Sequence, residues 1–432
     1  MKNRKALALI AILALVAAAC GGSDGGSDDA VVEVETTEAP ATTEAPTTTA
    51  APAPAGDPLI LASLMPLSGD LASLGPGIAL GAALAVEQIN AAGGINGQPV
   101  QLIEGDSGCD GAVALTSLND VIAQGAQGVM GAACSGTSLA ILDTAIAAEV
   151  VMVSPSNTSP QFTKIDKKGF YARTAPSDLL QGDVLASLLV EDGVQTVSII
   201  SRADSYGRGL AEATAAAFEA AGGTVKTIVY HATDATEFTS EVTAVGKGGA
   251  DAIVGILFPE TGCGVLQPAF EQGLLDTPWY MTDGVKDAGL ASLCGLGTAL
   301  DGFKGTAPGS AAGEAKDAFE AAYAGVSADG SPTFIFAPQA YDAVMLMAIS
   351  AAANGVTGPE IASGLVAASS GGEKCIGVAC IALAADGVDV DYVGASGEIE
   401  LNAVGDPTAA TYDIWTTEGD TNPVLKSVDF GS

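Results

Sequence analysis

Positive charge and histidine are scarce in this chain. Its 432 residues include 16 lysines and arginines against 51 aspartates and glutamates, which gives a formal net charge of −35. Such an acidic surface repels phosphates, which argues against nucleic acid or an anionic lipid surface as a partner. The one histidine, His231, has no companion ligand, and structural zinc sites show closely spaced ligand pairs. We therefore expect no metal.

Motifs for nucleotides and catalysis are also missing. No G-x-x-x-x-G-K-[ST] run occurs, and that run is what a phosphate-binding loop requires. Gly75, Gly77 and Gly81 superficially resemble a dinucleotide fingerprint, but Pro76 and the wrong final spacing break it. We interpret these glycines as the entry to a helix that packs closely on its strand. No cofactor is expected, and an enzyme is disfavoured because a single histidine provides poor evidence for an activated serine.

Membrane-length apolar runs are absent, and the N-terminus carries only a shorter one. Basic residues 2–5 precede an apolar stretch at 6–19, which is shorter than the ~20 residues of a membrane-spanning helix. This pattern predicts a signal peptide over 1–19. The small residues before Cys20 have the form of a bacterial lipoprotein cleavage site. We expect an exported chain that is lipid-anchored through Cys20 to the outer face of the cell membrane. Plain secretion with an unmodified Cys20 is the alternative.

A tether and two lobes are expected in the mature chain. Residues 20–57 contain no lysine or arginine and mix acidic residues with Thr, Ala and Pro, a composition typical of a disordered spacer. Residues 58–432 exceed what one hydrophobic core usually holds. We place the first lobe at 58–176 plus 306–400, and the second at 177–305 plus 401–432.

Six further cysteines remain, an even number that indicates disulfides in an exported chain. Six cysteines allow many pairings, of which we favour those between neighbours along the chain. The alternative use, zinc, is disfavoured because only one close cysteine pair is present. The favoured pairs are Cys109 with Cys134, Cys263 with Cys294, and Cys375 with Cys380.

Apolar strand-like runs alternate with helical patterns in two stretches of the chain. This alternation predicts an α/β fold with two doubly wound parallel-sheet lobes. In the first stretch we expect strands at 59–65, 100–103, 127–131 and 150–153, and helices at 77–90, 112–124 and 136–148. In the second we expect strands at 196–200, 225–229 and 252–257, and helices at 207–221, 238–247 and 264–273.

Parallel sheets bind ligands at the carboxyl ends of their strands, so the loops that follow the strands are candidate sites. Ser135 lies just before an expected helix, where a hydroxyl and backbone N–H groups suit a carboxylate. A purely structural N-cap is the alternative. The hydroxyl-rich segment 154–160 allows the same two interpretations. The candidate loops are 65–69, 132–137, 154–159, 202–209, 258–262 and 282–285.

Several segments together resemble the branched-chain amino acid-binding family, the type I solute-binding proteins of ABC importers. The resemblance spans about 58–432, and its joint pattern is more specific than any one segment. The segments are 65–70 (MPLSGD), 87–97 (EQINAAGGING), 106–110 (DSGCD), 133–135 (ACS), 153–158 (VSPSNT), 204–209 (DSYGRG), 340–344 (AYDAV), 394–397 (GASG) and 405–407 (GDP).

The resemblance implies that the two lobes are joined by a three-crossing hinge, with crossings near 176–177, near 305–308 and between 394 and 407.

The resemblance also implies a role for each matching residue. Cys109 and Cys134 match the family's disulfide at the lip of the first lobe. Ser135 and Thr158 match residues that bind the ligand's α-carboxylate. The remaining matches are Ser156, whose carbonyl would accept the ammonium, Asp283 as its acidic partner, and Tyr206 closing over the ligand.

The chain departs from the family at the side-chain pocket. Leu74 and Phe258 stand where tyrosines are common, so the pocket is expected to be more apolar. The implied function is a receptor that delivers an amino acid with an apolar side chain to an ABC transporter permease. The alternatives are an amide, a urea-like solute or a small aromatic acid as ligand, or a sensing domain for a signalling partner.

Overall fold

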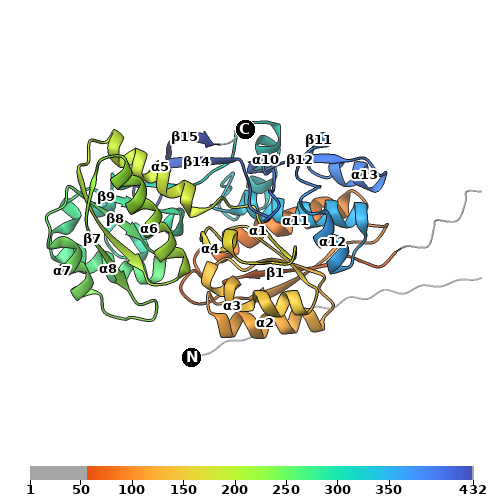
Figure 1. Ribbon diagram of the computed structural model, residues 1–432, viewed down its shortest axis with the longest axis horizontal. Coiled ribbons are helices and arrows are strands. Elements are labelled where there is room, and N and C mark those ends of the chain that lie inside the picture. Colours follow the sequence, from red (N-terminus) through yellow and green to blue (C-terminus); the bar gives the residue numbers. More distant parts are fainter. Residues whose placement is uncertain (1–55, 431–432) are drawn as a thin grey trace, which may run out of the picture. The chain divides into compact units, whose positions relative to one another are not determined.

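The computed structural model describes residues 56–430 and contains two large sheets with helices on both faces (Figure 1). Cys20, the predicted signal peptide 1–19 and most of the predicted tether lie outside the described residues. We call the part built on the five-stranded sheet the first lobe and the part built on the seven-stranded sheet the second lobe. The predicted α/β class with parallel sheets is confirmed.

The first sheet is entirely parallel, with the order β2-β1-β3-β4-β5. Its strands are β1 (Ile60–Met65), β2 (Gln101–Asp106), β3 (Gly128–Gly131), β4 (Val151–Ser154) and β5 (Tyr171–Arg173). The helices of this part of the chain are α1 (Gly75–Ala91), α2 (Gly111–Ala123), α3 (Ser135–Ala147), α4 (Gln161–Lys164), α10 (Glu314–Val326), α11 (Ala337–Asn354), α12 (Gly358–Gly364) and α13 (Ala379–Ala385).

Alternate residues of β1 face opposite cores. Leu61 and Met65 join the core that contains α1 and α11, whereas Ala62 and Leu64 join the core of α2 and α3. Successive side chains of a strand point to opposite faces, so a strand covered on both faces is apolar throughout. All six positions of β1 are buried or half-buried. Figure 1 shows α2 and α3 on one side of β1, with α1 and α11 on the other.

The glycines near the start of α1 allow close packing, as the sequence suggested. A Cβ at Gly75 would collide with the Pro66 carbonyl oxygen, and a Cβ at Gly81 would collide with the Ala337 carbonyl oxygen. Glycine is therefore required where α1 leaves β1 and where it crosses α11. Pro76 stands at the first turn of α1, where its missing N–H breaks no helical hydrogen bond.

The second sheet has the order β15-β14-β10-β9-β8-β6-β7. Its core strands are parallel, and β14 and β15 add an antiparallel pair at one edge. The strands are β6 (Thr196–Arg202), β7 (Thr224–His231), β8 (Ala252–Ile256), β9 (Trp279–Met281), β10 (Lys304–Pro308), β14 (Ala410–Thr416) and β15 (Val424–Phe430). The helices are α5 (Asp178–Glu191), α6 (Ser205–Ala220), α7 (Thr239–Gly246), α8 (Pro259–Glu271) and α9 (Leu290–Leu293), with 3-10 turns η1 (Leu274–Asp276), η2 (Asp283–Val285) and η3 (Gly297–Leu300).

The chain passes between the sheets slightly later than the expected boundaries at 305/306 and 400/401. The strand β10 remains in the second sheet to Pro308. Asp406 bonds to Arg173 at the end of the first sheet (Oδ1 to Nε, 2.9 Å), so the chain stays with that sheet beyond 401. A small third sheet comes before Asp406 in the chain. It is formed by β11 (Glu373–Ile376), β12 (Val390–Gly394) and β13 (Gly397–Glu398).

The start of α8 differs most from the expectation. We predicted a loop at 258–262 and a helix from 264, but α8 begins at Pro259. Proline is favoured at the first helical position because its fixed φ suits the helix. Among residues 56–430, no helix has the length and apolar character needed to cross a membrane.

Candidate functional site

A small cavity of about 20 Å³ lies between the two large sheets, at the carboxyl ends of their parallel strands. The first lobe contributes residues that follow β1, β3 and β4, and the second contributes residues that follow β6, β8 and β9. Its apolar lining consists of Leu71, Leu74, Ile78, Ala133, Phe258 and Phe336. Its polar lining consists of Ser135, Ser156, Tyr206 and Asp283, beside Gly284.

The N-terminus of α3 forms the polar part of the first-lobe wall. Ser135 is the first helical residue, and Cys134 is the N-cap and makes no side-chain capping bond. The interpretation of Ser135 as a structural N-cap is therefore wrong. The first N–H groups of a helix have no partner inside the helix and carry the positive end of its dipole. The first turn of α3 contains no acidic side chain, so this end suits an anionic group of a ligand.

The Cys109–Cys134 disulfide fixes this helix end to the loop after β2. Near it, the Ser156 hydroxyl donates to the Ala133 carbonyl (3.1 Å), and the Asn157 amide donates to the same oxygen (2.8 Å). These bonds attach the loop after β4 to the loop after β3. The disulfide and these bonds therefore hold the start of α3 against two neighbouring loops of the first lobe.

Asp283 provides a buried acid on the second-lobe wall. Its Oδ1 accepts hydrogen bonds from Gln181 Nε2 (2.7 Å) and the Tyr206 hydroxyl (3.0 Å). No lysine, arginine or histidine of the described residues forms an ion pair with it. Burial raises the pKa of Asp283 to about 6. A buried carboxylate without a cation is costly, so this position favours a ligand that brings positive charge.

A second buried acid, Asp178, lies at the start of α5. Burial, with the nearby Asp283 carboxylate adding to it, raises the pKa of Asp178 well above its usual range. Like-charged acids in one low-dielectric region do not both ionise readily. Burial therefore disfavours the charged form of Asp178 more strongly when Asp283 is ionised.

The residues opposite these polar groups form an apolar wall. The rings of Tyr206 and Phe258 stack with centroids 5.4 Å apart. Leu71 and Leu74 come from the first lobe. The cavity therefore combines one anion seat, one acid and an apolar remainder, as a small dipolar molecule with an apolar side chain requires.

The expected residues divide into those that line the cavity and one that does not. Ser135, Ser156, Tyr206, Asp283, Leu74 and Phe258 all line it. Thr158 is fully buried and lies outside the lining, where its carbonyl accepts from the Asp178 N–H (2.8 Å).

Sequence reasoning missed some lining residues. Ile78 was visible only as part of a helix face, and Ala133 only as part of a motif. Phe336 has a positive φ of 60° before α11, and nothing in its local sequence marks it as a cavity residue. Phe336 lies far along the chain from every loop that we expected at the site. Only the folded structure brings Phe336 to the cavity.

His231 does not lie beside the serines of the cavity, so these residues do not form a serine–histidine catalytic pair. His231 ends β7, a strand at the sheet edge, and is outside the cavity lining. Its ring packs edge-on against Phe238, with centroids 5.0 Å apart, and burial lowers its pKa. A serine nucleophile needs a base within hydrogen-bond reach, which His231 does not provide.

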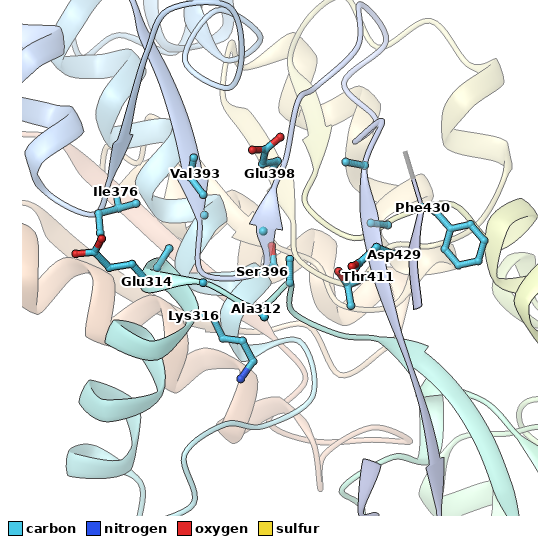
Figure 2. Close-up of a pocket in the computed structure, with 17 residues that line it drawn as sticks. Ala312, Glu314, Lys316, Ile376, Val393, Ser396, Glu398, Thr411, Asp429 and Phe430 are labelled. Carbon is cyan, nitrogen blue, oxygen red and sulfur yellow. Dashed lines mark hydrogen bonds between the residues drawn. The ribbon is translucent and has the colours of Figure 1, made fainter. Parts of the chain in front are cut away.

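A larger groove of about 600 Å³ lies elsewhere, between the start of α10, the β12–β13 hairpin and the C-terminal strands. Figure 2 shows Glu314, Lys316, Glu398 and Asp429 spread around it. Lys316 pairs with Glu320 on its own helix. The groove lacks the convergence of buried polar groups that distinguishes a small-molecule site.

Two α/β lobes with a cavity at their strand ends define the class of two-lobed binding proteins. A family model described as periplasmic binding protein matches residues 58–374. That match covers more than half of the chain, which therefore belongs to the periplasmic binding protein family.

Curated relatives agree with this membership. An "Amino acid binding protein" of Pseudomonas aeruginosa is 34% identical over 238 residues, covering 53% of this chain and 62% of the relative. A "Leucine-, isoleucine-, valine-, threonine-, and alanine-binding protein" of the same organism is 29% identical over 304 residues, covering 68% of this chain and 78% of the relative. The chain thus spans less than two thirds of the first of these relatives.

Solved structures show the same fold. The branched-chain amino acid transporter substrate-binding protein LivJ of Streptococcus pneumoniae, in complex with isoleucine, has a TM-score of 0.72 at 22% identity. The match covers 87% of this chain and 100% of that one. A solute-binding protein of an ABC transporter from R. palustris, in complex with benzoate, has a TM-score of 0.70 at 18% identity, covering 87% and 98%.

Proposed function

We propose that this chain is an exported receptor that binds an amino acid with a compact apolar side chain between its two lobes. The observation that carries the proposal is the pairing of Asp283, a buried acid without a cation, with the N-terminus of α3 at Ser135 across one apolar cavity. An ammonium at Asp283 and a carboxylate at Ser135 would each meet opposite charge, which removes the cost of burying them.

The proposal includes a movement of the two lobes about the segments that join them. One lobe would carry the carboxylate seat and the other the ammonium partner, so that the ligand favours the closed arrangement over an open one. We place the hinge crossings near Pro176, after Pro308 and near Asp406. This placement is supported by the pairing of β10 with β14 as far as Pro308 and by the bond from Arg173 to Asp406.

Delivery to an ABC transporter permease and lipid anchoring at Cys20 complete the proposed function. The support is the family membership, the relatives that bind amino acids, and the signal-like N-terminus with its cysteine. No catalytic role is part of it.

A small aromatic acid is the second candidate ligand. The stacked Tyr206 and Phe258 rings favour it, and the R. palustris neighbour was solved with benzoate. Asp283 opposes it, because a ligand without an amine leaves this acid unpaired beside a second anion.

A calorimetric panel separates the candidates. Leucine, isoleucine, valine, alanine, acetamide, urea and benzoate are each titrated into the wild-type protein and into Asp283→Ala. We expect leucine-like ligands to bind the wild type and to lose about 2–5 kcal/mol in the variant, as when one partner of a buried charge pair is removed. Benzoate binding that survives or improves in the variant, with no amino acid bound by the wild type, would establish the second candidate instead.

A further inference from the structure

Asp70 of the first lobe contacts the second lobe at the rim of the cavity. Its Oδ1 accepts from the Thr261 N–H (2.9 Å), its Oδ2 accepts from the Thr261 hydroxyl (3.2 Å), and its carboxylate pairs with Arg202. Asp70 follows β1, whereas Arg202 ends β6 and Thr261 lies in the first turn of α8. The Asp70 side chain thus connects the segment after β1 to the end of β6 and to the helix that follows β8.

The helix α8 has no N-terminal cap of its own. Its N-cap residue, Phe258, makes no side-chain capping bond, and Pro259 at the next position has no N–H to offer. A helix leaves its first N–H groups without partners inside the helix. Asp70 accepts one of them, so the acid that a capping residue normally provides comes from the other lobe.

A second contact runs in the opposite direction. The Glu260 side chain in the first turn of α8 accepts from the Ser73 N–H (3.2 Å), and Ser73 belongs to the first-lobe segment between β1 and α1. The two segments therefore each provide a carboxylate for the other's backbone, in the manner of a capping box. Separation of the lobes would break both contacts at once.

Arg202 connects this junction to the cavity wall. Its side chain is 3% exposed, its Nε donates to Asp204 Oδ2 (2.9 Å), and its Nη1 donates to the Thr261 hydroxyl (3.1 Å). Its guanidinium lies 3.8 Å from the centre of the Phe258 ring, a distance at which a cation and an aromatic face attract. Phe258 itself lines the cavity.

Asp204 extends the connection to Tyr206. It is the N-cap of α6 and accepts from the Gly207 N–H (2.9 Å), and Tyr206 lies in the turn that it caps. Arg202 therefore touches Phe258 directly and Tyr206 through this cap. These two rings form the stacked aromatic wall of the cavity.

We propose that Asp70 and Arg202 are positioning residues that couple closure of the two lobes to the shape of the aromatic wall. The proposal rests on the proposed function, since closure and ligand binding are assumed to be linked. In the closed arrangement Arg202 lies between two carboxylates, those of Asp70 and Asp204, and α8 is capped. In an open arrangement α8 loses its cap and Arg202 keeps only Asp204. The pair therefore favours the closed, binding-competent state and slows ligand release.

Two substitutions separate charge from capping. Asp70→Asn keeps an oxygen that can accept from the Thr261 N–H but removes the charge opposite Arg202. Asp70→Ala removes both. Asp120→Ala is the matched control, because Asp120 is an exposed acid on α2 in the same lobe and its loss changes the net charge equally.

The experiment measures leucine dissociation rates by stopped flow and Kd by calorimetry, together with hydrogen exchange of the Thr261 N–H by NMR in the ligand-free protein. For Asp70→Ala we expect a Kd raised by about tenfold or more, mainly through faster dissociation, and faster Thr261 exchange. Asp70→Asn should lie between this variant and wild type and lose part of the salt dependence of binding. Asp120→Ala should behave as wild type.

Equal dissociation rates and equal Thr261 exchange in wild type, Asp70→Ala and Asp120→Ala would overturn the proposal. If wild type binds no amino acid, the proposed function fails, but the exchange measurement still decides whether Asp70 caps α8. A variant that fails to fold would show lost signal dispersion throughout the spectrum, and Asp70→Asn then provides the test.

Discussion

Asp283 is the residue on which the chemistry of the cavity depends. It receives two hydrogen bonds from Gln181 and Tyr206 but no cation, and burial raises its pKa to about 6. The usual pKa of an aspartate is about 3.9, so the folded chain holds this proton more tightly than the unfolded chain. Ionisation of Asp283 therefore costs stability as pH rises from about 4 to about 6, and a bound ammonium would restore it.

Amino-acid affinity is expected to depend on pH through this residue. Above pH 6 the Asp283 carboxylate is charged and can pair with an ammonium, whereas below pH 6 protonation removes that charge. Affinity should fall by up to about tenfold for each pH unit below 6. Calorimetry between pH 4.5 and 8 on wild type and Asp283→Asn checks this, and a slope in the Asn variant equal to that of wild type would assign the dependence to another group.

The sequence could place most cavity residues, but only where a local motif accompanied them. The rule that parallel sheets bind ligands at strand ends predicted the loops that contain Ser135, Ser156 and Asp283, and the resemblance to a known family singled out these residues within the loops. Phe336 has no such segment, and it reaches the cavity from the start of α11. Thr158 matched a motif, yet it is not among the lining residues, and its carbonyl accepts from the Asp178 N–H at the start of α5.

At the scale of elements, close contacts between backbones determine which glycines are required. Gly81 lies where α1 crosses α11, and a Cβ there would collide with the Ala337 carbonyl. The strand–helix alternation was readable because buried strands and amphipathic helices differ in apolar period. The start of α8 was missed although Pro259 is a local signal for a first helical position. The partner of the Thr261 N–H, Asp70, could not be read locally because it lies far away in the sequence.

Gly81→Ala is expected to lower the free energy of unfolding by about 1–3 kcal/mol, since it overpacks the contact between α1 and α11. Gly325→Ala is the matched control. Gly325 lies in α10 with no atom near its would-be Cβ, so alanine there should be neutral or stabilising by up to about 1 kcal/mol. Urea unfolding of both variants makes the comparison, and equal losses would show that Gly81 is not specifically constrained.

The Cys109–Cys134 disulfide joins the loop after β2 to the start of α3. Its loop spans 25 residues, against 5 for Cys375–Cys380. Replacing both Cys109 and Cys134 by serine should lower stability by ~2–4 kcal/mol, and the same change at Cys375 and Cys380 should cost less, because a shorter loop restricts the unfolded chain less. Thermal unfolding checks the order. Peptide mapping that finds free thiols at Cys109 and Cys134 would reject the pairing.

At the scale of the whole molecule, the proposed function requires two lobes that change their relation when ligand binds. The cavity is bounded by residues of both lobes, and the Asp70 contacts span its rim. A ligand shifts such an equilibrium only by its difference in affinity for the two states. A leucine-like molecule that touches both walls has this difference.

Small-angle scattering should therefore show a smaller radius of gyration when a binding amino acid is added, provided that the ligand-free protein populates the open arrangement. Asp283→Ala, titrated to the same leucine concentration, should contract less because fewer molecules are occupied. Saturating binding by calorimetry without any contraction would contradict ligand-driven closure, while leaving the identity of the ligand intact.

The most direct measurement is a crystal structure of the protein with leucine. The account predicts the leucine ammonium within hydrogen-bond distance of Asp283, its carboxylate at the first turn of α3 beside Ser135, and its side chain against Leu74 and Phe258. A leucine bound in the groove between α10 and the β12–β13 hairpin, or oriented with its carboxylate toward Asp283, would contradict it.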